Sequence, residues 1–267
     1  MSTLTVVLTH LAGPAADDRM ELLRAVAPDA RLVVGHGGTR SDYERVTWPE
    51  KFFVDDPTLR GPAQHLQSLT QVFEIAWREY VARDAELDSV YVIEYDHLIL
   101  DPAFEHRLRA LASETGADLL GKTCVDRTAT NEAHYIRWRR DERLLEHLRR
   151  HSVREDPEQI FGALGDGLWL TRRALEAYVN VGTHPPCYCE VYVPTLVHHL
   201  GFRVVDIDRH GDLYHHVRWL PEYSSSEVLA LARAGVPFVH PAKDPALDAA
   251  LREIVGDRAR PAGARGA

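Results

Sequence analysis

The chain has 267 residues, of which 45% are hydrophobic and 27% charged, as expected of a globular protein with a substantial core. A formal net charge of −9 disfavours a general nucleic-acid or anionic-membrane binder, and no stretch approaches the roughly 20 apolar residues of a membrane helix. Three cysteines, two of them in Cys187-Tyr188-Cys189, argue against a disulfide framework and a metal–thiolate site and favour the cytoplasm.

Short apolar strands alternate with helical patterns through the first half of the chain. Strands are expected at residues 4–9, 31–35, 51–54, 89–94 and 117–123, and helices at 14–27, 64–83 and about 103–114. The N-terminal run has no basic flank, so it indicates a core strand rather than a signal peptide. This alternation is typical of βαβ units and predicts an α/β fold with a mostly parallel central sheet flanked by helices.

The second half is more irregular. Helices are expected at about residues 141–150, from about Leu170, at 190–200, near 225–234 and near the end of the chain, and strands at 203–207 and 212–219. In the latter strand, His215 and His216 would point opposite ways. Residues 161–167 form a glycine-punctuated stretch, and the tail 256–267 is rich in Arg, Ala, Gly and Pro, which predicts disorder.

Strand 89–94 ends in acidic residues, followed by His97. Residues two apart in a strand point to the same side, so Glu94 and Asp96 would face one site, where two carboxylates repel unless a proton or cation intervenes. Mg²⁺ and Mn²⁺ are often held by one or two protein carboxylates together with phosphate oxygens. The pair of carboxylates therefore predicts a metal site; the alternative is a strand end exposed to solvent. His97 would be a metal ligand, a group that orients a ligand, or the first residue of the turn.

A longer segment around this pair resembles the nucleotide-sugar glycosyltransferases of the GT-A fold. Residues 61–70 read G-P-A-Q-H-L-Q-S-L-T and precede an amphipathic helix, the core strand V-Y-V-I-E-Y-D and a further helix after Asp101-Pro102. In that family such a strand ends in an Asp-X-Asp-type motif, here the variant Glu94-Tyr95-Asp96. The resemblance implies that Asp96, and less directly Glu94, bind a metal that bridges the nucleotide diphosphate.

Further matches follow in the family's order. The segment 161–175 resembles a glycine-rich stretch on the acceptor side, and 188–204 resembles the helix that carries an acidic catalytic base, which would be Glu190. Asp166 is the alternative base or a ligand of the acceptor hydroxyl. A first-turn glutamate also suits any helix, and the helix dipole there would lower the pKa of Glu190. His240-Pro-Ala-Lys243 resembles the element that supplies a metal ligand and a cation on the diphosphate; His215 or His216 is the alternative to His240.

The remaining site residues follow from the fold that the resemblance implies. The ends of the first two strands would bind the base and ribose of the nucleotide through Thr9, His10 and the turn at Gly35 to Gly38, with Asp55-Asp56 and Gln64 as further contacts. Residues 1–255 would form one GT-A-like catalytic domain, with a nucleotide-binding half at 1–123 and an acceptor-side half at 124–255.

These expectations describe a metal-dependent glycosyltransferase that moves a sugar from a nucleoside diphosphate sugar to a hydroxyl acceptor. Its cofactor would be Mn²⁺ or Mg²⁺, and a base opposite the leaving group would invert the anomeric centre. Two alternatives stay open. One is a nucleotidyltransferase on a related sheet, which the acidic character of the segment 11–18 disfavours, and the other is a catalytically inactive protein that keeps the fold to bind a partner.

Overall fold

The computed structural model describes residues 2–57, 69–165, 167–244 and 246–259. Its strands are β1 (Ser2–Thr9), β2 (Arg31–His36), β3 (Lys51–Phe53), β4 (Leu87–Glu94), β5 (Leu98–Ile99), β6 (Leu119–Gly121), β7 (Val125–Asp126), β8 (Phe161–Gly162), β9 (Leu168–Thr171), β10 (Val204–Asp206) and β11 (Phe238–Val239). Its helices are α1 (Pro14–Val26), α2 (Arg40–Arg45), α3 (Thr70–Ile75), the π-helix η3 (Ala76–Val81), α4 (Phe104–Thr115), α5 (Ala133–Arg139), α6 (Glu142–His151), α7 (Arg172–Asn180), α8 (Cys189–His199), the 3₁₀-helix η4 (Ile207–Arg209), α9 (Ser225–Ala234) and α10 (Leu247–Ala259).

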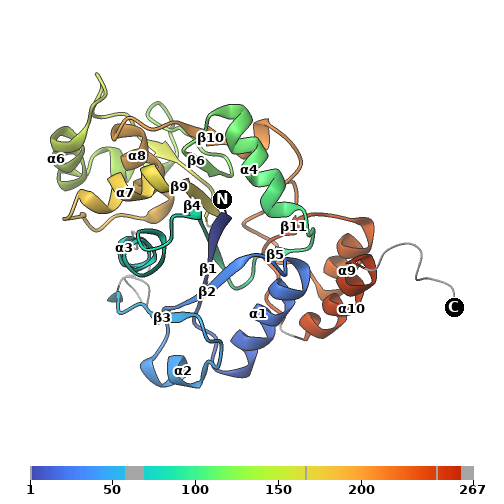
Figure 1. Ribbon diagram of the computed structural model, residues 1–267. Helices are drawn as coiled ribbons and strands as arrows, with labels where there is room; N and C mark the ends of the chain where they lie inside the picture. Colours follow the sequence, from blue (N-terminus) through green and yellow to red (C-terminus); the bar gives the residue numbers. More distant parts are fainter. Residues whose placement is uncertain (1, 58–68, 166, 245, 260–267) are drawn as a thin grey trace, which may run out of the picture.

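A seven-stranded sheet with the order β10-β6-β9-β4-β1-β2-β3 forms the centre of the molecule (Figure 1). All neighbouring strands pair in parallel except β9, which is antiparallel to both β4 and β6. The chain moves outward from β1 to β2 and β3, and then returns to the other side of β1 at β4. Strand order therefore reverses between β1 and β4, the position at which open α/β sheets bind ligands beyond the carboxyl ends of their strands.

Helices cover both faces of this sheet (Figure 1). One apolar cluster joins one sheet face to α1, α4, α9 and α10, and a second cluster joins the other face to α3, α7 and α8. Successive strand residues point to opposite faces, so Val7 belongs to the first cluster and Val6 to the second. Burial on both faces explains why β1 and β4 read as nearly unbroken apolar runs. The predicted mixed α/β fold with a mostly parallel sheet is confirmed.

Most predicted elements agree with the structure to within a few residues. Pro14 at the first position of α1 needs no hydrogen-bond donor there, and α9 begins with a capping box between Ser224 and Glu227. The predicted helix 64–83 corresponds to α3 and η3 from Thr70; residues 58–68 lie outside the described part of the chain. Helix α10 extends to Ala259, into the predicted tail, and residues 260–267 are likewise not described.

The helix expected from about Leu170 is α7, which begins at Arg172 after Thr171, whose hydroxyl accepts the Ala174 N–H. The strand β9 directly before it was not predicted, and the strand predicted at 212–219 is wrong. A short apolar run does not distinguish a buried strand from a helix by periodicity. Residues 212–219 form turns, apart from one bridge between Val217 and His240, and the rings of His215 and His216 stack with centroids 5.5 Å apart instead of pointing opposite ways.

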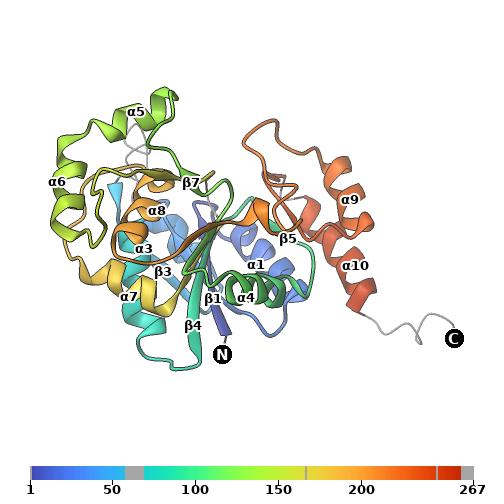
Figure 2. The same ribbon diagram turned by 90° about the horizontal axis from the view of Figure 1, so that it is seen from above.

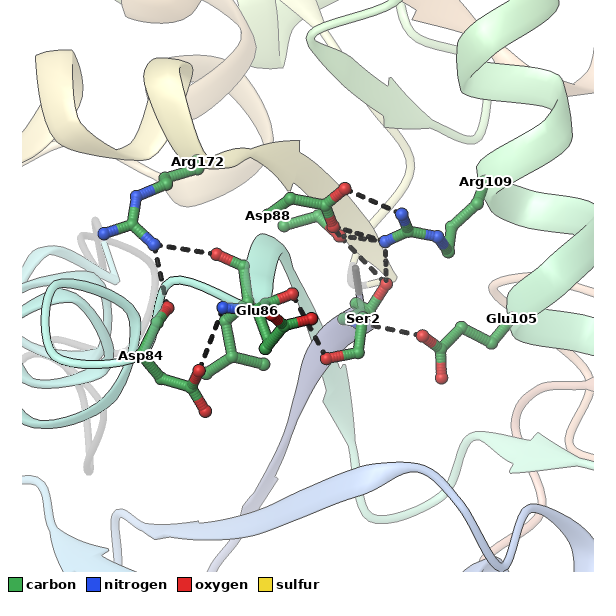
Figure 3. A network of polar contacts seen from close by, with 10 residues as sticks. Ser2, Asp84, Glu86, Asp88, Glu105, Arg109 and Arg172 are labelled. Carbon is green, nitrogen blue, oxygen red and sulfur yellow. Dashed lines mark hydrogen bonds and ion pairs between the residues drawn. The ribbon is translucent and has the colours of Figure 1, made fainter.

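At the amino ends of β1 and β4, polar groups from several elements pair with one another (Figure 3). Arg109 of α4 forms an ion pair with Asp88, and the hydroxyls of Thr3 and Ser89 are 2.9 Å apart. The guanidinium of Arg172 donates to two backbone carbonyls, those of residues 84 and 87, at 2.9 Å each. These contacts connect α4 and α7 to the start of the two central strands.

Within the described ranges, no helix is long and apolar enough to cross a lipid bilayer.

Candidate functional site

A cavity of about 1010 Å³ lies at the carboxyl ends of β1 and β4. One wall comes from residues between 132 and 190, in the part of the molecule with α5 to α8, and the opposite wall comes from residues 218–243, next to α9 (Figure 2). The predicted site residues that line it are Thr9, His10, Glu94, Asp96, Glu190, His240 and Lys243. Of the eight predicted site residues that the structure describes, seven thus lie at one cavity, at the switch point of the sheet.

Asp96 sits in a tight turn directly after β4. The N–H of His97 donates to the carbonyl of Glu94 at 3.0 Å, and the N–H of Ala242 donates to the carbonyl of Asp96 at 2.9 Å. The Asp96 side chain is buried, with 2% of the residue exposed, and its Oδ1 has no hydrogen-bond partner among the described residues. A buried carboxylate oxygen without a partner is costly, so it indicates a position intended for a cation or ligand.

Two imidazoles lie against this oxygen. Nε2 of His240 is 3.6 Å and Nδ1 of His97 is 3.7 Å from Oδ1 of Asp96. Burial lowers the pKa of His240, although Asp96 opposes the shift, so the neutral ring that can bind a metal is favoured. One ligand atom from each of these three residues lies within 4.8 Å of the others. The donors fit a divalent metal ion, and Glu94, although it lines the cavity, is not part of this group.

Glu190 occupies the first turn of α8 and lines the cavity from the other side. It is 7% exposed, and its Oε1 accepts the backbone N–H of Gly165 at 2.6 Å. Burial raises the pKa of Glu190 from 4.5 to about 7, with the Gly165 and Tyr188 hydrogen bonds opposing the shift and Glu94 adding to it. The prediction that the helix dipole lowers the pKa of Glu190 is therefore wrong in direction, because the loss of water around the carboxylate outweighs the dipole. A carboxylate with this pKa is suited to general base catalysis near neutral pH.

Two cations lie on the wall formed by residues 218–243. Nζ of Lys243 is 2.7 Å from Oε1 of Glu222, and this contact raises the pKa of Lys243. Arg218, which the sequence did not indicate, places its guanidinium 3.5 Å from the centre of the Tyr223 ring. The backbone N–H of Arg218 donates to the backbone carbonyl of His240 at 3.1 Å, so these two residues belong to one hydrogen-bonded segment.

The predicted nucleotide contacts are only partly brought together. His10 is exposed at the end of β1, with its ring edge-on to Tyr95 at 4.9 Å, and the carbonyl of Thr9 accepts the N–H of Gly37 at 2.9 Å. Asp56 follows the edge strand β3 and is not among the residues that line the cavity. Gln64 and Asp166 lie outside the described residues.

The cavity also contains aromatic and apolar residues that the sequence did not indicate. Tyr135 and Tyr188 lie on one wall, and Trp219 and Leu220 lie on the other with 62% and 66% exposure. The spacing of residues in the sequence did not place Trp219 and Leu220 at the cavity, because residues 212–219 were expected to form a strand. The only available signal was two large apolar residues between Arg218 and Pro221.

No family model and no curated protein sequence matches this chain. Among solved structures, a galactosyltransferase, LgtC, in complex with donor and acceptor sugar analogs is similar with a TM-score of 0.40 and 14% identity, over 100% of this chain and 99% of that chain. Residues 1-349 of S. aureus TarS are similar with a TM-score of 0.42 and 12% identity, over 97% of this chain and 71% of that chain. A197 from STIV is similar with a TM-score of 0.33 and 15% identity, over 76% of this chain and 80% of that chain. These scores are too low to assign the chain to a family.

Proposed function

We propose that this protein is a metal-dependent glycosyltransferase that moves a sugar from a nucleoside diphosphate sugar to a hydroxyl acceptor. The observation that carries the proposal is the composition of a single cavity. It contains the unpartnered Oδ1 of Asp96 beside His240, and it also contains Glu190 with a pKa of about 7. A cation site and a general base are the two groups that sugar transfer to a hydroxyl requires.

The donor would lie along the ends of β1 and β4. Thr9, His10 and the Gly37 turn line this part of the cavity and would contact the base and ribose. Asp96 and His240 would bind a divalent metal ion, which when bound neutralises charge on the departing diphosphate. Lys243 and Arg218 add positive charge to the same wall. Lys243 pairs with Glu222, so a phosphate oxygen of the donor would compete with that carboxylate for the ammonium group.

The acceptor would lie between the two walls, with its reactive hydroxyl at Glu190. The carboxylate takes the hydroxyl proton as the oxygen attacks the anomeric carbon, and the bond to the diphosphate breaks on the opposite side. A single displacement of this kind inverts the anomeric centre. The Gly165 N–H bond fixes the orientation of Glu190, and Tyr188 flanks it. In this proposal residues 1–123 bind the nucleotide, while 124–255 supply the acceptor site and also His240 and Lys243.

Thermal unfolding with a panel of nucleoside diphosphates, each with and without MnCl₂, tests the donor side. A ligand that binds only the folded chain raises stability, by about 2.7 kcal/mol at a concentration of 100 Kd. We expect one base to give the largest rise in melting temperature, and only with metal present. The absence of a response to every nucleotide would contradict the proposal.

A panel of nucleotide sugars with mixed hydroxyl acceptors, followed by mass spectrometry, tests the reaction itself. A product heavier than its acceptor by one sugar residue is expected with the donor whose nucleotide stabilises the fold. The anomeric configuration of that product, read by NMR, tests the base assignment: retention would exclude single displacement with Glu190 as the base.

A further inference from the structure

Arg19 is a buried charged residue next to the turn that follows β4, and the proposed reaction gives it no role. It lies in α1 and is 1% exposed. Its Nη1 donates to the backbone carbonyl of Tyr95, the residue before Asp96. Its Nε lies 3.1 Å from both carboxylate oxygens of Asp248, a residue in the first turn of α10 that is also 1% exposed. One guanidinium thus connects two helices to the turn that carries Asp96.

A second contact joins the same turn to the segment that leads into α10. The N–H of Ala242 donates to the carbonyl of Asp96 at 2.9 Å. This segment is therefore attached to the turn at position 242 directly and at position 248 through Arg19. Because His240 and Lys243 are close in sequence to the first attachment, the two contacts together fix one wall of the cavity relative to Asp96.

The buried ion pair is not needed to hold the two helices together. Helix α10 packs against α1 (Figure 1), and apolar residues of both helices, Met20 and Leu251 among them, belong to one core cluster. Burial raises the pKa of Asp248 although Arg19 opposes the shift, so the loss of water around the carboxylate outweighs the attraction of the guanidinium. Apolar residues often replace a buried ion pair without loss of stability. The position in which the pair holds the turn therefore explains it better than its contribution to stability.

We infer that Arg19 and Asp248 are positioning residues, which hold the Tyr95–Asp96 peptide so that the Asp96 carboxylate stays at a fixed place beside His240. Arg19 supplies the donor for the Tyr95 carbonyl, and Asp248 fixes the direction of that donor. Neither residue lines the cavity, so both act on it through the turn. The expected effect on sugar transfer rests on the proposed function, whereas the effect on the turn does not.

A double substitution separates positioning from stability. Arg19→Met or Asp248→Leu alone leaves one buried charge unpaired and should lower the urea midpoint of unfolding. The two changes together remove both charges and should recover most of that loss. The carbonyl of Tyr95 would still lack its donor, so Asp96 would still be misplaced. Because small misplacements can slow a reaction by about 10²-fold, we expect the double variant to transfer sugar at least about tenfold more slowly.

Amide hydrogen exchange gives a second readout, which does not depend on sugar transfer. The N–H of Ala242 is hydrogen-bonded to Asp96, so its exchange rate reports whether the turn keeps its place. In the double variant we expect this amide to exchange at least about tenfold faster, whereas the amides of β1 and β4, which open only when the whole chain unfolds, should change much less. A purely stabilising ion pair would change all these rates in proportion.

Asp18→Asn is the matched control. Asp18 also connects α1 to α10, through Arg252 at 3.4 Å, but its side chain is 56% exposed and this ion pair lies at the surface. The substitution should leave both sugar transfer and the exchange of the Ala242 amide unchanged.

The outcomes distinguish this inference from the proposed function. Unchanged exchange at Ala242 in the double variant, or a change only in proportion to the strand amides, would overturn the positioning role and leave the transferase proposal standing. Selectively faster exchange in a protein whose unaltered chain transfers no sugar would support the positioning role and contradict the proposed function. If the double variant does not fold, Asp248→Asn, which removes only the charge, is compared by the same exchange ratio.

Discussion

At the amino ends of β1 and β4 polar side chains hydrogen-bond to one another, whereas at the carboxyl ends of the same two strands two buried polar atoms of the described residues make no hydrogen bond. Asp88 pairs with Arg109 (Figure 3), and Thr3 pairs with Ser89. At the other end, Oδ1 of Asp96 and Nδ1 of His240 are buried without a hydrogen-bond partner among the described residues. The two ends share strands and backbone pairing, so the difference lies in the side chains.

This difference indicates which end stabilises the fold and which end binds. A closed polar network lowers the free energy of the folded chain by itself. An unpartnered buried carboxylate raises it until a cation or ligand arrives, and a buried Glu190 with a raised pKa has the same effect at neutral pH. Substitutions at the two ends should therefore have opposite consequences.

The largest effect is expected for Asp96→Asn. The change removes the carboxylate of the proposed metal site, and Lewis-acid stabilisation is worth several kcal/mol, so transfer should fall by about 10³-fold. The free energy of unfolding without ligand should not decrease, because Oδ1 makes no hydrogen bond that the amide would lose. Initial rates with MnCl₂ and urea unfolding without it measure the two quantities. A large loss of stability would show that the carboxyl end is a structural network like the amino end.

Glu190→Gln should lower transfer about 10²-fold or more, because the proposed general base is lost, and should stabilise the fold above neutral pH. The folded pKa of Glu190 is raised from 4.5 to about 7. Its contribution to stability is therefore fully present below pH 4.5 and is lost as the pH rises through about 7. The loss amounts to about 3 kcal/mol at pH 8.5.

Urea unfolding at pH 4 and pH 8.5 checks this sign. The variant should match the original chain at pH 4 and exceed it at pH 8.5, since glutamine still accepts the Gly165 N–H. The rate of the original chain should rise with pH through about 7. Equal stability of the two proteins at both pH values would mean that Glu190 is not desolvated.

Asp88→Asn at the amino end should give the smallest effect, a loss of stability of about 1 to 2 kcal/mol with unchanged transfer and metal response. Burial opposes ionisation of Asp88, but the Arg109 ion pair holds its pKa below the ordinary 3.8. The contribution of Asp88 is therefore present above pH 3.8 and is lost as the pH falls through the lower folded value. Urea unfolding at pH 7 and pH 3 measures it; an altered Mn²⁺ affinity would show that the two ends are coupled.

The sequence by itself determined the central parallel strands and the edge of the sheet at which the cavity lies. Apolar runs flanked by turn residues located β1, β2 and β4, because strands buried on both faces exclude polar side chains. Glu94 at the end of β4 and Asp96 beyond it then had to lie at the carboxyl edge. The same rule did not predict β9, because its four residues are too few to show a period.

Only the tertiary structure decided what these residues contact and which protonation states are favoured. Asp96 meets His240 because residues 238–243 return to β5 and the turn after β4, a contact that no local pattern encodes. The same holds for the position of His97 and for the wall that carries Arg218 and Trp219. The pKa of Glu190 depends on how much water the whole fold excludes, so a sequence rule based on its helix gave the wrong direction.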